Sequence, residues 1–301
     1  MQTGIFKPIP HLATYLNFKL IGAAPKALAL ANLQQLLRMA DGRRAVVGLS
    51  VNLCKSLAIK APQALRAFQT PAGGKLKLPE TPVDLLVWLR ATPAQDRGDL
   101  LTISRQVQAL LGDTFVLTET VEAFQHLSKS GKNSKGINRD LTGYEDGTEN
   151  PKGQKAVDFG FAPDGGSFLA VQKWQHKWEN ITKMSPTEQN QAFGRNKQSN
   201  AELETAPPSA HIKRTTQEDF TLSDGTEGFS LRRSMPWSDG ANSGLMFAAF
   251  GKSFEAFELQ LARMVGADDG ITDAVFKMSK PITGSFFWCP PAVDGEIKYK
   301  L

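Results

Sequence analysis

ATYLNFKLIGAAPKALALANLQQLLRM, residues 13–39, joins an apolar run typical of a β-strand to a leucine-rich run with helical spacing. In the second run apolar side chains recur three or four residues apart, at Leu30, Leu33 and Leu37. Side chains at this spacing share one face of a helix, so they can cover a sheet while the opposite face stays in water. The stretch predicts a strand over 13–21 and an amphipathic helix over 26–39.

The order strand, helix, strand, strand, helix, strand occurs twice along the chain. In the first half the expected elements are 13–21, 26–39, 44–51, 83–89, 97–111 and 114–124. In the second half they are 167–174, 186–193, 228–235, 244–250, 254–265 and 282–289. This pattern predicts an α+β protein of two tandem ferredoxin-like (βαββαβ) halves with antiparallel sheets. The polar stretch 128–140 separates them, which predicts an N-terminal half 1–135 and a C-terminal half 136–301.

The composition is that of a folded protein without a membrane span, since 41% of the 301 residues are apolar and 22% are charged. No apolar run approaches the ~20 residues that cross a bilayer. The first residues lack the charged start and apolar stretch of a secretory signal, so we expect a cytoplasmic protein. Two cysteines far apart in sequence, Cys54 and Cys289, predict buried free thiols rather than a disulfide or a zinc site.

The net charge of +5 includes one dense basic region, KSGKNSK at residues 129–135. No aromatic side chains interleave with its lysines to stack on bases, and its glycine and serines favour a solvated loop. We therefore expect neither nucleic-acid binding nor membrane binding.

A loop rich in glycine and carboxylates follows the expected boundary, GYEDGTENP at residues 143–151. Its glycines favour a tight turn whose main chain a ligand can approach closely, with Asp146 held in a fixed position. An aspartyl-phosphatase loop is excluded because its nucleophilic aspartate would stand where this chain has Tyr144. On the residues alone, such a loop is more often a plain turn, and a functional loop stays open.

Of the four histidines, His211 has the least ordinary context. His11, His126 and His176 lie beside strand-like sequence, where a structural role is the default. His211 instead follows two prolines in the polar insertion 196–226, and loops of that length are usually functional or disordered. The residues alone nevertheless favour a structural role for His211 as well.

Four segments occur in the order in which B-type dye-decolorising peroxidases carry their landmarks: 143–151 (GYEDGTENP), 209–211 (SAH), 231–236 (LRRSMP) and 272–274 (TDA). The chain resembles this family over nearly its whole length. The resemblance implies a haem b (iron protoporphyrin IX) in the C-terminal half, with His211 as the iron ligand. It also implies hydrogen peroxide and a small-molecule or dye-like reductant as partners, and a homodimer or larger homo-oligomer.

The resemblance also implies a role for each landmark. Asp273 matches the carboxylate that accepts the second ring N–H of the axial histidine. Asp146 matches the acid–base group that moves the peroxide proton, and Arg232 matches the cation that stabilises charge on the leaving oxygen. Gly147 and Thr148 follow Asp146 in the loop expected to contact the haem.

Three further residues complete the expected site. Alternation in the expected strand places Arg232 and Ser234 on one face and Arg233 on the other, which favours Arg232 as the catalytic arginine. Some family members carry asparagine where this chain has Ser234. The serine side chain is shorter than asparagine, and its hydroxyl is suited to holding a water on the peroxide side of the haem. Arg195 and Arg214 are candidates for pairing with the haem propionates, because a guanidinium matches a carboxylate bidentately.

The function that the resemblance implies is a haem peroxidase that oxidises dyes, phenols or other one-electron donors through a high-valent iron intermediate. Two alternatives stay open on the sequence. The first is a haem-binding carrier, sensor or iron-releasing protein with incidental peroxidase activity, although a carrier has no need of Asp146 and Arg232 over the iron. The second is a metal-free ferredoxin-like binding module.

Overall fold

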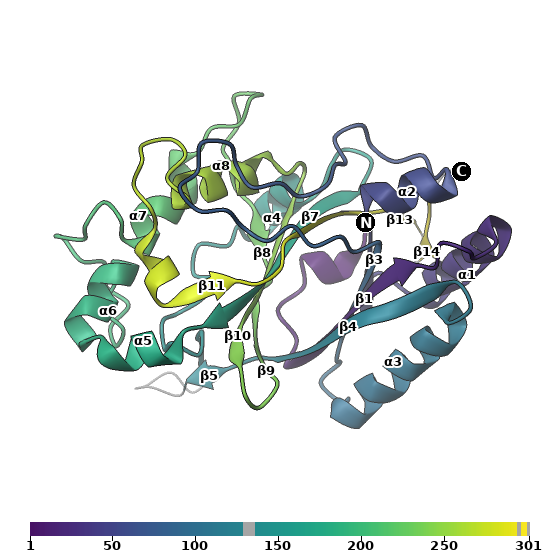
Figure 1. Ribbon diagram of the computed structural model, residues 1–301, viewed down its shortest axis with the longest axis horizontal. Coiled ribbons are helices and arrows are strands. Elements are labelled where there is room, and N and C mark those ends of the chain that lie inside the picture. Colours follow the sequence, from purple (N-terminus) through teal and green to yellow (C-terminus); the bar gives the residue numbers. More distant parts are fainter. Residues whose placement is uncertain (129–135, 294–295, 300–301) are drawn as a thin grey trace.

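The computed structural model describes residues 1–128, 136–293 and 296–299, and helices and strands are mixed along the chain (Figure 1). The strands are β1 (Leu12–Leu20), β2 (Ala45–Leu49), β3 (Leu85–Arg90), β4 (Phe115–Phe124), β5 (Leu127–Ser128), β6 (Ile137–Asn138), β7 (Ser167–His176), β8 (Leu231–Arg232), β9 (Met235–Ser238), β10 (Ser243–Gly251), β11 (Ser279–Pro281), β12 (Ser285–Cys289), β13 (Ala292–Val293) and β14 (Glu296–Ile297). The helices are α1 (Lys26–Met39), α2 (Val51–Leu57), α3 (Arg97–Leu111), α4 (Gln154–Gly160), α5 (Trp178–Lys183), α6 (Pro186–Phe193), α7 (His211–Thr215) and α8 (Glu255–Met264), with 3₁₀ turns η1 (Thr3–Ile5), η2 (Gln217–Asp219) and η3 (Ala274–Lys277). The predicted α+β class with antiparallel sheets is confirmed.

Three helices, α1, α3 and α6, have the bounds that the sequence predicts. At the start of α3, the side chains of Asp96 and Asp99 each accept the main-chain N–H of the other. Ser185 and Glu188 repeat this arrangement at the start of α6. Such a capping box satisfies two N–H groups that the helix itself leaves without partners, so it fixes the first residue of the helix.

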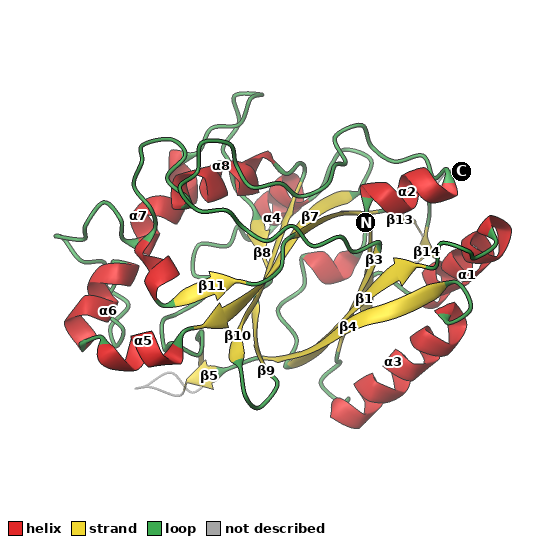
Figure 2. Ribbon diagram, in the orientation of Figure 1, coloured by secondary structure: helices red, strands yellow, loops and turns green. Residues whose placement is uncertain are grey.

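Ten strands form one closed sheet in the order β11-β7-β12-β2-β3-β1-β4-β9-β10-β8, and the additional pairing of β7 with β10 closes the ring. Figure 2 shows these strands crossing the middle of the molecule with helices outside them. Two narrow seams join the N-terminal and C-terminal strands, with Trp288 opposite Leu49 and Ala123 opposite Trp237. Because strand pairing crosses both seams, the two sequence halves share one sheet.

Alternate side chains of the strands enter two apolar cores. On β1, Leu16 and Phe18 belong to the core that includes residues of α1 and α3, whereas Tyr15 belongs to the core on the other face. Trp88 stacks on Tyr15 at 5.8 Å and on Phe250 at 5.9 Å between ring centroids. These stacked rings connect strands of the two halves across the inside of the closed sheet.

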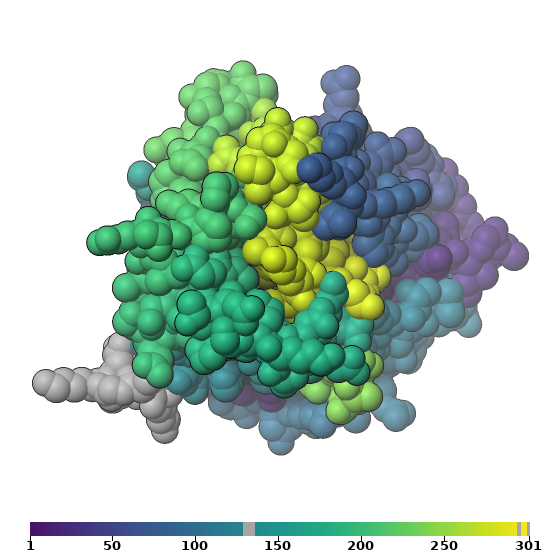
Figure 3. Space-filling model, turned by 60° about the vertical axis from the view of Figure 1, so that its left-hand side comes forward, coloured from purple at the N-terminus to yellow at the C-terminus, as the bar shows by residue number. Residues whose placement is uncertain are grey.

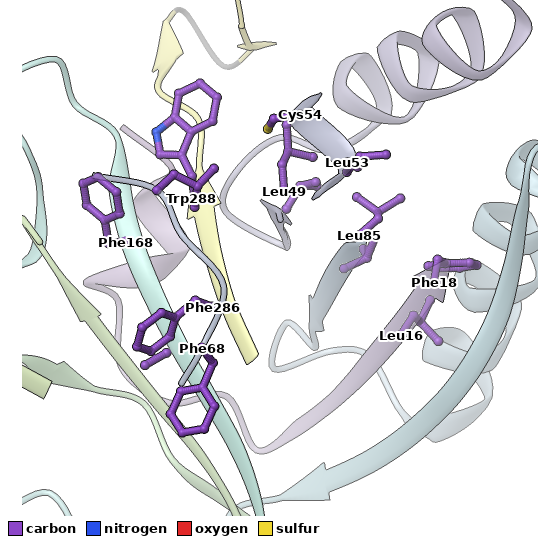
Figure 4. Close-up of a cluster of buried hydrophobic side chains, with 14 of the residues drawn as sticks. Leu16, Phe18, Leu49, Leu53, Cys54, Phe68, Leu85, Phe168, Phe286 and Trp288 are labelled. Atoms are coloured by element: carbon purple, nitrogen blue, oxygen red, sulfur yellow. The ribbon is translucent and has the colours of Figure 1, made fainter. Parts of the chain in front are cut away.

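A cluster of phenylalanines joins β12 to the long segment between α2 and β3 (Figure 4). Phe286 stacks on Phe254 at 3.9 Å and meets Phe68 edge-on at 5.2 Å. The N–H of Thr81, near the end of the segment, donates to the carbonyl of Gly284. Figure 3 shows the result on one face, where the dark blue part of the N-terminal half lies against the yellow C-terminal part.

Helix α2 is absent from the sequence prediction, which extends a strand over 44–51. The strand β2 ends at Leu49, and Ser50 takes the position before the helix. The hydroxyl of Ser50 accepts the N–H of Leu53, which is the usual way in which a serine starts a helix. This local signal is present in the sequence but is masked there by the apolar residues around it.

Two expected strands of the C-terminal half also have different bounds. The strand expected over 228–235 begins only at Leu231, as β8, and resumes in the same register as β9. The strand expected over 282–289 is β12, and a separate strand, β11, precedes it. The expected boundary at residue 135 lies outside the described residues. Within the described ranges, no helix is both long and apolar enough to cross a membrane.

Candidate functional site

A cavity is lined by residues of β7, β8, β10, α7 and α8 and by the loop that follows β6. These elements lie in the C-terminal part of the fold (Figure 1). The apolar part of its wall includes Phe193, Leu245, Phe247, Phe257, Leu261 and Met264. Pockets for small molecules are mostly apolar with a few polar groups. This cavity therefore has the lining of a cofactor site.

His211 begins the single-turn helix α7 and lines this cavity. Its Nδ1 lies 2.8 Å from Oδ2 of Asp273, a fully buried carboxylate whose other oxygen accepts the N–H of Val275. An ionised carboxylate only accepts hydrogen bonds, so the proton of a neutral His211 ring lies on Nδ1 and Nε2 presents its lone pair. Nε2 has no hydrogen-bond partner among the described residues. The ring is therefore prepared to ligate a metal centre through Nε2.

His211 and Asp273 are 62 residues apart in sequence, so tertiary contacts must hold their two segments together. The N–H of Ala274 donates to the carbonyl of Ser209 at 2.7 Å. The N–H of Asp273 donates to the carbonyl of Met264 at 2.9 Å, at the end of α8. The end of α8 thus sets the position of the carboxylate that orients the histidine.

The loop that carries Asp146 turns tightly after β6. Gly143 and Gly147 have φ angles of 94° and 74°, a region that glycine enters without the steric cost of a Cβ. The N–H of Asp146 donates to the carbonyl of Asn138 at 3.1 Å, which closes the turn. Gly147, Thr148 and Asp146 all line the cavity.

Asp146 and Arg232 line the same cavity, and their charges interact. Burial raises the pKa of the Asp146 carboxyl, and the neighbouring Asp140 raises it further, although Arg232 opposes both. The side chain of Asn150 accepts the N–H of Arg232 at 2.7 Å and donates to its carbonyl at 3.0 Å. The result is a carboxyl that holds a proton more readily than a free aspartate, near an arginine whose main chain is held by Asn150.

The strands β8 and β9 pair with β10 in one continuous register. Side chains alternate along a strand, so Arg232 and Ser234 lie on the face of β10 that borders the cavity and Arg233 lies on the other face. Arg233 is buried there and donates to the carbonyls of Ile5 and Phe6. The register agrees with the predicted alternation. Ser234 does not itself line the cavity, and its buried Oγ has no partner in the described residues.

The two arginines expected at the propionates lie in different places. Arg195 lines the cavity and donates to Glu149 at 3.0 Å and to Glu202 at 2.7 Å. Arg214 does not line the cavity, because its buried guanidinium is satisfied by the carboxylates of residues 268–269. Of the two arginines, Arg195 therefore lies in the cavity wall and Arg214 lies away from it.

The cavity wall contains a buried polar chain that the sequence does not predict, formed by Asp140, His176 and Ser279. His176 Nε2 lies 3.1 Å from Oδ2 of Asp140, and its Nδ1 lies 3.2 Å from Oγ of Ser279. Burial opposes ionisation of Asp140, but the hydrogen bond and charge of His176 prevail and lower its pKa. Asp140 is 36 positions and Ser279 is 103 positions from His176, so no local pattern indicates their contact.

Residues 137–294, just over half of the chain, match the family model for the C-terminal part of Dyp-type peroxidases. The chain belongs to the Dyp-type peroxidase family. A Dye-decolorizing peroxidase from Brevibacterium linens is 32% identical over 253 residues, which cover 78% of this chain and 65% of that protein. The chain thus spans slightly less than two thirds of this relative.

Solved structures agree with this membership of the Dyp-type peroxidases. The Dye-decolorizing protein from V. cholerae superposes with a TM-score of 0.79 at 26% identity, over 96% of both chains. A DypB variant from Rhodococcus jostii in complex with heme superposes with a TM-score of 0.81 at 25% identity, over 95% of both chains. The fold described above is therefore the fold of this family.

Proposed function

We propose that this Dyp-type peroxidase uses bound haem and hydrogen peroxide to oxidise dyes, phenols or other one-electron donors. The observation that supports this most directly is the convergence of three groups on one cavity. Asp146 brings a carboxyl and Arg232 a guanidinium to this cavity, and His211 presents a ring nitrogen that no described residue bonds. A haem carrier needs an axial ligand and apolar walls, but the acid and the cation serve a reaction that moves a proton and develops charge.

The residues of the cavity fit a haem. The walls are largely apolar, and Nε2 of His211 is available to the iron. Buried polar atoms of Arg232 and Ser234 lack partners within the described residues, as expected where a bound group completes the site. The described residues contain no group of three His, Cys, Asp or Glu side chains that could hold a bare metal ion. We infer haem b, with His211 at the iron and Arg195 near a propionate.

Haem bound here would supply the electron exchange with peroxide and reductant that no side chain of the cavity can perform. Asp146 would accept the proton from one peroxide oxygen and return it to the oxygen that leaves as water. Arg232 would stabilise the negative charge on that leaving oxygen. Asp273 would hold the Nδ1–H of His211, which fixes the ring and raises the basicity of Nε2. Ser234 would hold a water on the face of Arg232.

The test compares wild type with His211→Ala and Asp146→Asn after loading with haem. The Soret band is recorded first, and the absorbance change is then followed after addition of one equivalent of hydrogen peroxide. We expect His211→Ala to lose the wild-type Soret spectrum, because the axial nitrogen is gone. We expect Asp146→Asn to keep that spectrum while its rate constant with peroxide falls by about 10²–10⁴-fold.

His11→Ala is the matched control, since its exposed ring lies outside the cavity and bonds the carbonyl of Gln95. This control should reproduce the wild type in both measurements. An unchanged Soret band in His211→Ala would refute the ligand assignment. A wild type that binds haem and does not respond to peroxide would refute the peroxidase and favour the haem-carrier alternative.

Four finer points are also proposals. The strand orders β2-β3-β1-β4 and β12-β7-β10-β9 support two ferredoxin-like halves, since each has its first and third strands in the centre. We place the division between them at 1–135 and 136–301. A cytoplasmic location and a homodimer or larger homo-oligomer stay predictions.

A further inference from the structure

A buried amide on β7 has an unpaired donor at the cavity. Gln172 is 1% exposed, lines the cavity, and has no hydrogen-bond partner for Nε2 within the described residues. Its orientation is fixed, because Nε1 of Trp174 donates to Oε1 of Gln172 at 3.1 Å. An indole nitrogen only donates, so the amide oxygen must face Trp174 and the amide nitrogen must face away from it.

The register of the sheet places this donor on the same wall as Arg232. Gln172 is directly opposite Phe247 of β10, and the continuous pairing of β8 and β9 with β10 places Ser234 opposite Phe247 on its other side. Residues directly opposite one another point to the same face of a sheet. With strands about 4.8 Å apart, Gln172 and Ser234 flank Phe247 in one row about 10 Å long.

Three polar groups on this face of the sheet share one property, which is a buried atom without a partner in the described residues. They are Nε2 of Gln172, Oγ of Ser234 and Nε of Arg232. Buried polar groups are nearly always hydrogen-bonded, because an unpaired one loses its hydration without compensation. Two of these atoms only donate and belong to an amide and a cation, so a bound acceptor with negative charge is the partner that suits them.

We propose that Gln172 is a ligand-binding residue that donates a hydrogen bond to a small anionic acceptor held on the Arg232 face of the cavity. The acceptor class is a small inorganic anion that would bind in the cavity when haem is present. This inference rests on the proposed haem site and adds a donor from β7 to those that the family landmarks place on the loop and on β8. Trp174 is the positioning residue that keeps the amide from rotating.

Fluoride titration of the haem-loaded protein at constant pH tests the proposal, since fluoride is a small anion that accepts hydrogen bonds and shifts the Soret band on binding. Gln172→Leu removes the donor with little change in volume. Gln172→Glu keeps the acceptor for Trp174 and replaces the donor by a carboxylate. We expect the fluoride Kd to rise about 10-fold in Gln172→Leu, and further in Gln172→Glu because the charges repel.

Gln175→Leu is the matched control on the same strand, because residue 175 points to the opposite face and its side chain donates to Asn242. It should leave the fluoride Kd unchanged. The haem affinity and the melting temperature of every variant are recorded alongside. A variant that is misfolded is thereby distinguished from one that has lost only its affinity for the anion.

A weaker fluoride Kd in the Gln172 variants with unchanged haem affinity supports the proposal. A fluoride Kd within twofold of wild type in both variants overturns it. This holds also if the haem affinity falls in these variants, because Gln172 would then donate to the haem itself rather than to an anion. A wild type that takes up no haem overturns the proposed function and this inference with it, which distinguishes the two failures.

Discussion

Replacing His176 with leucine should destabilise the protein, because it removes the partner of a buried carboxylate. The side chains of His176 and Asp140 are 4% and 12% exposed, and Nε2 and Oδ2 are 3.1 Å apart. Breaking a buried pair by removing one partner costs about 3–5 kcal/mol. Thr142 still donates its N–H to Asp140 in the variant, so we expect a loss near the lower end, about 3 kcal/mol.

Asp140→Asn should cost less, about 1–2 kcal/mol, because its amide oxygen still accepts from Thr142 and no charge is left unpaired. The hydrogen bond to His176 lowers the pKa of Asp140 against the effect of burial. A carboxyl with a lowered folded pKa contributes stability that is complete above its unfolded value of about 3.9 and is lost as pH falls through the folded value. The difference in free energy of unfolding between wild type and Asp140→Asn should therefore be complete at pH 7 and become smaller below about pH 4.

Urea unfolding of the haem-free protein, followed by tryptophan fluorescence, gives both free energies without the contribution of a bound ligand. His11→Leu is the control, and it should change the free energy of unfolding by no more than about 0.5 kcal/mol. A loss in His176→Leu below about 1 kcal/mol would refute the reasoning, because it would fall in the range of an exposed pair. The reasoning would also be refuted if the free energies of unfolding of wild type and Asp140→Asn differed by the same amount at pH 7 and at pH 3.

Three further outcomes are expected. Phe286→Ala should lower the free energy of unfolding by about 3–5 kcal/mol, since its ring stacks on Phe254 in the core; a urea midpoint like that of wild type would contradict this. Ala58→Gly should raise the melting temperature slightly, with a gain of up to about 1 kcal/mol, because Ala58 has a φ of 56°; a lower melting temperature would show that the strain is absent. Asp273→Asn should weaken haem binding about 10–100-fold in a Soret titration, because its amide oxygen keeps the bond to Val275 and its amide nitrogen then faces Nδ1–H of His211. A haem affinity equal to that of wild type would show that Asp273 does not orient the histidine.

Local patterns in the sequence decide the helices and the loop that carries Asp146. The bounds of α3 and α6 follow from capping pairs three residues apart, Asp96 with Asp99 and Ser185 with Glu188. The alternation of Arg232 and Arg233 is likewise fixed by strand geometry, which has a period of two residues. These features depend on neighbours within one helical turn or one pleat, so the sequence contains the whole cause.

The tertiary structure alone decides how the strands close into one sheet and which polar groups meet at the cavity. Gln172 and Ser234 share a wall only because β7 and β9 both pair with β10 in a particular register. His176 meets Asp140 and Ser279 only because segments 36 and 103 residues away fold against the end of β7. A shift of one residue in either register would turn these side chains to the opposite face. The sequence by itself therefore determined the longer helices, most of the strands and the family landmarks, whereas long-range packing determined the cavity and the partners of its buried groups.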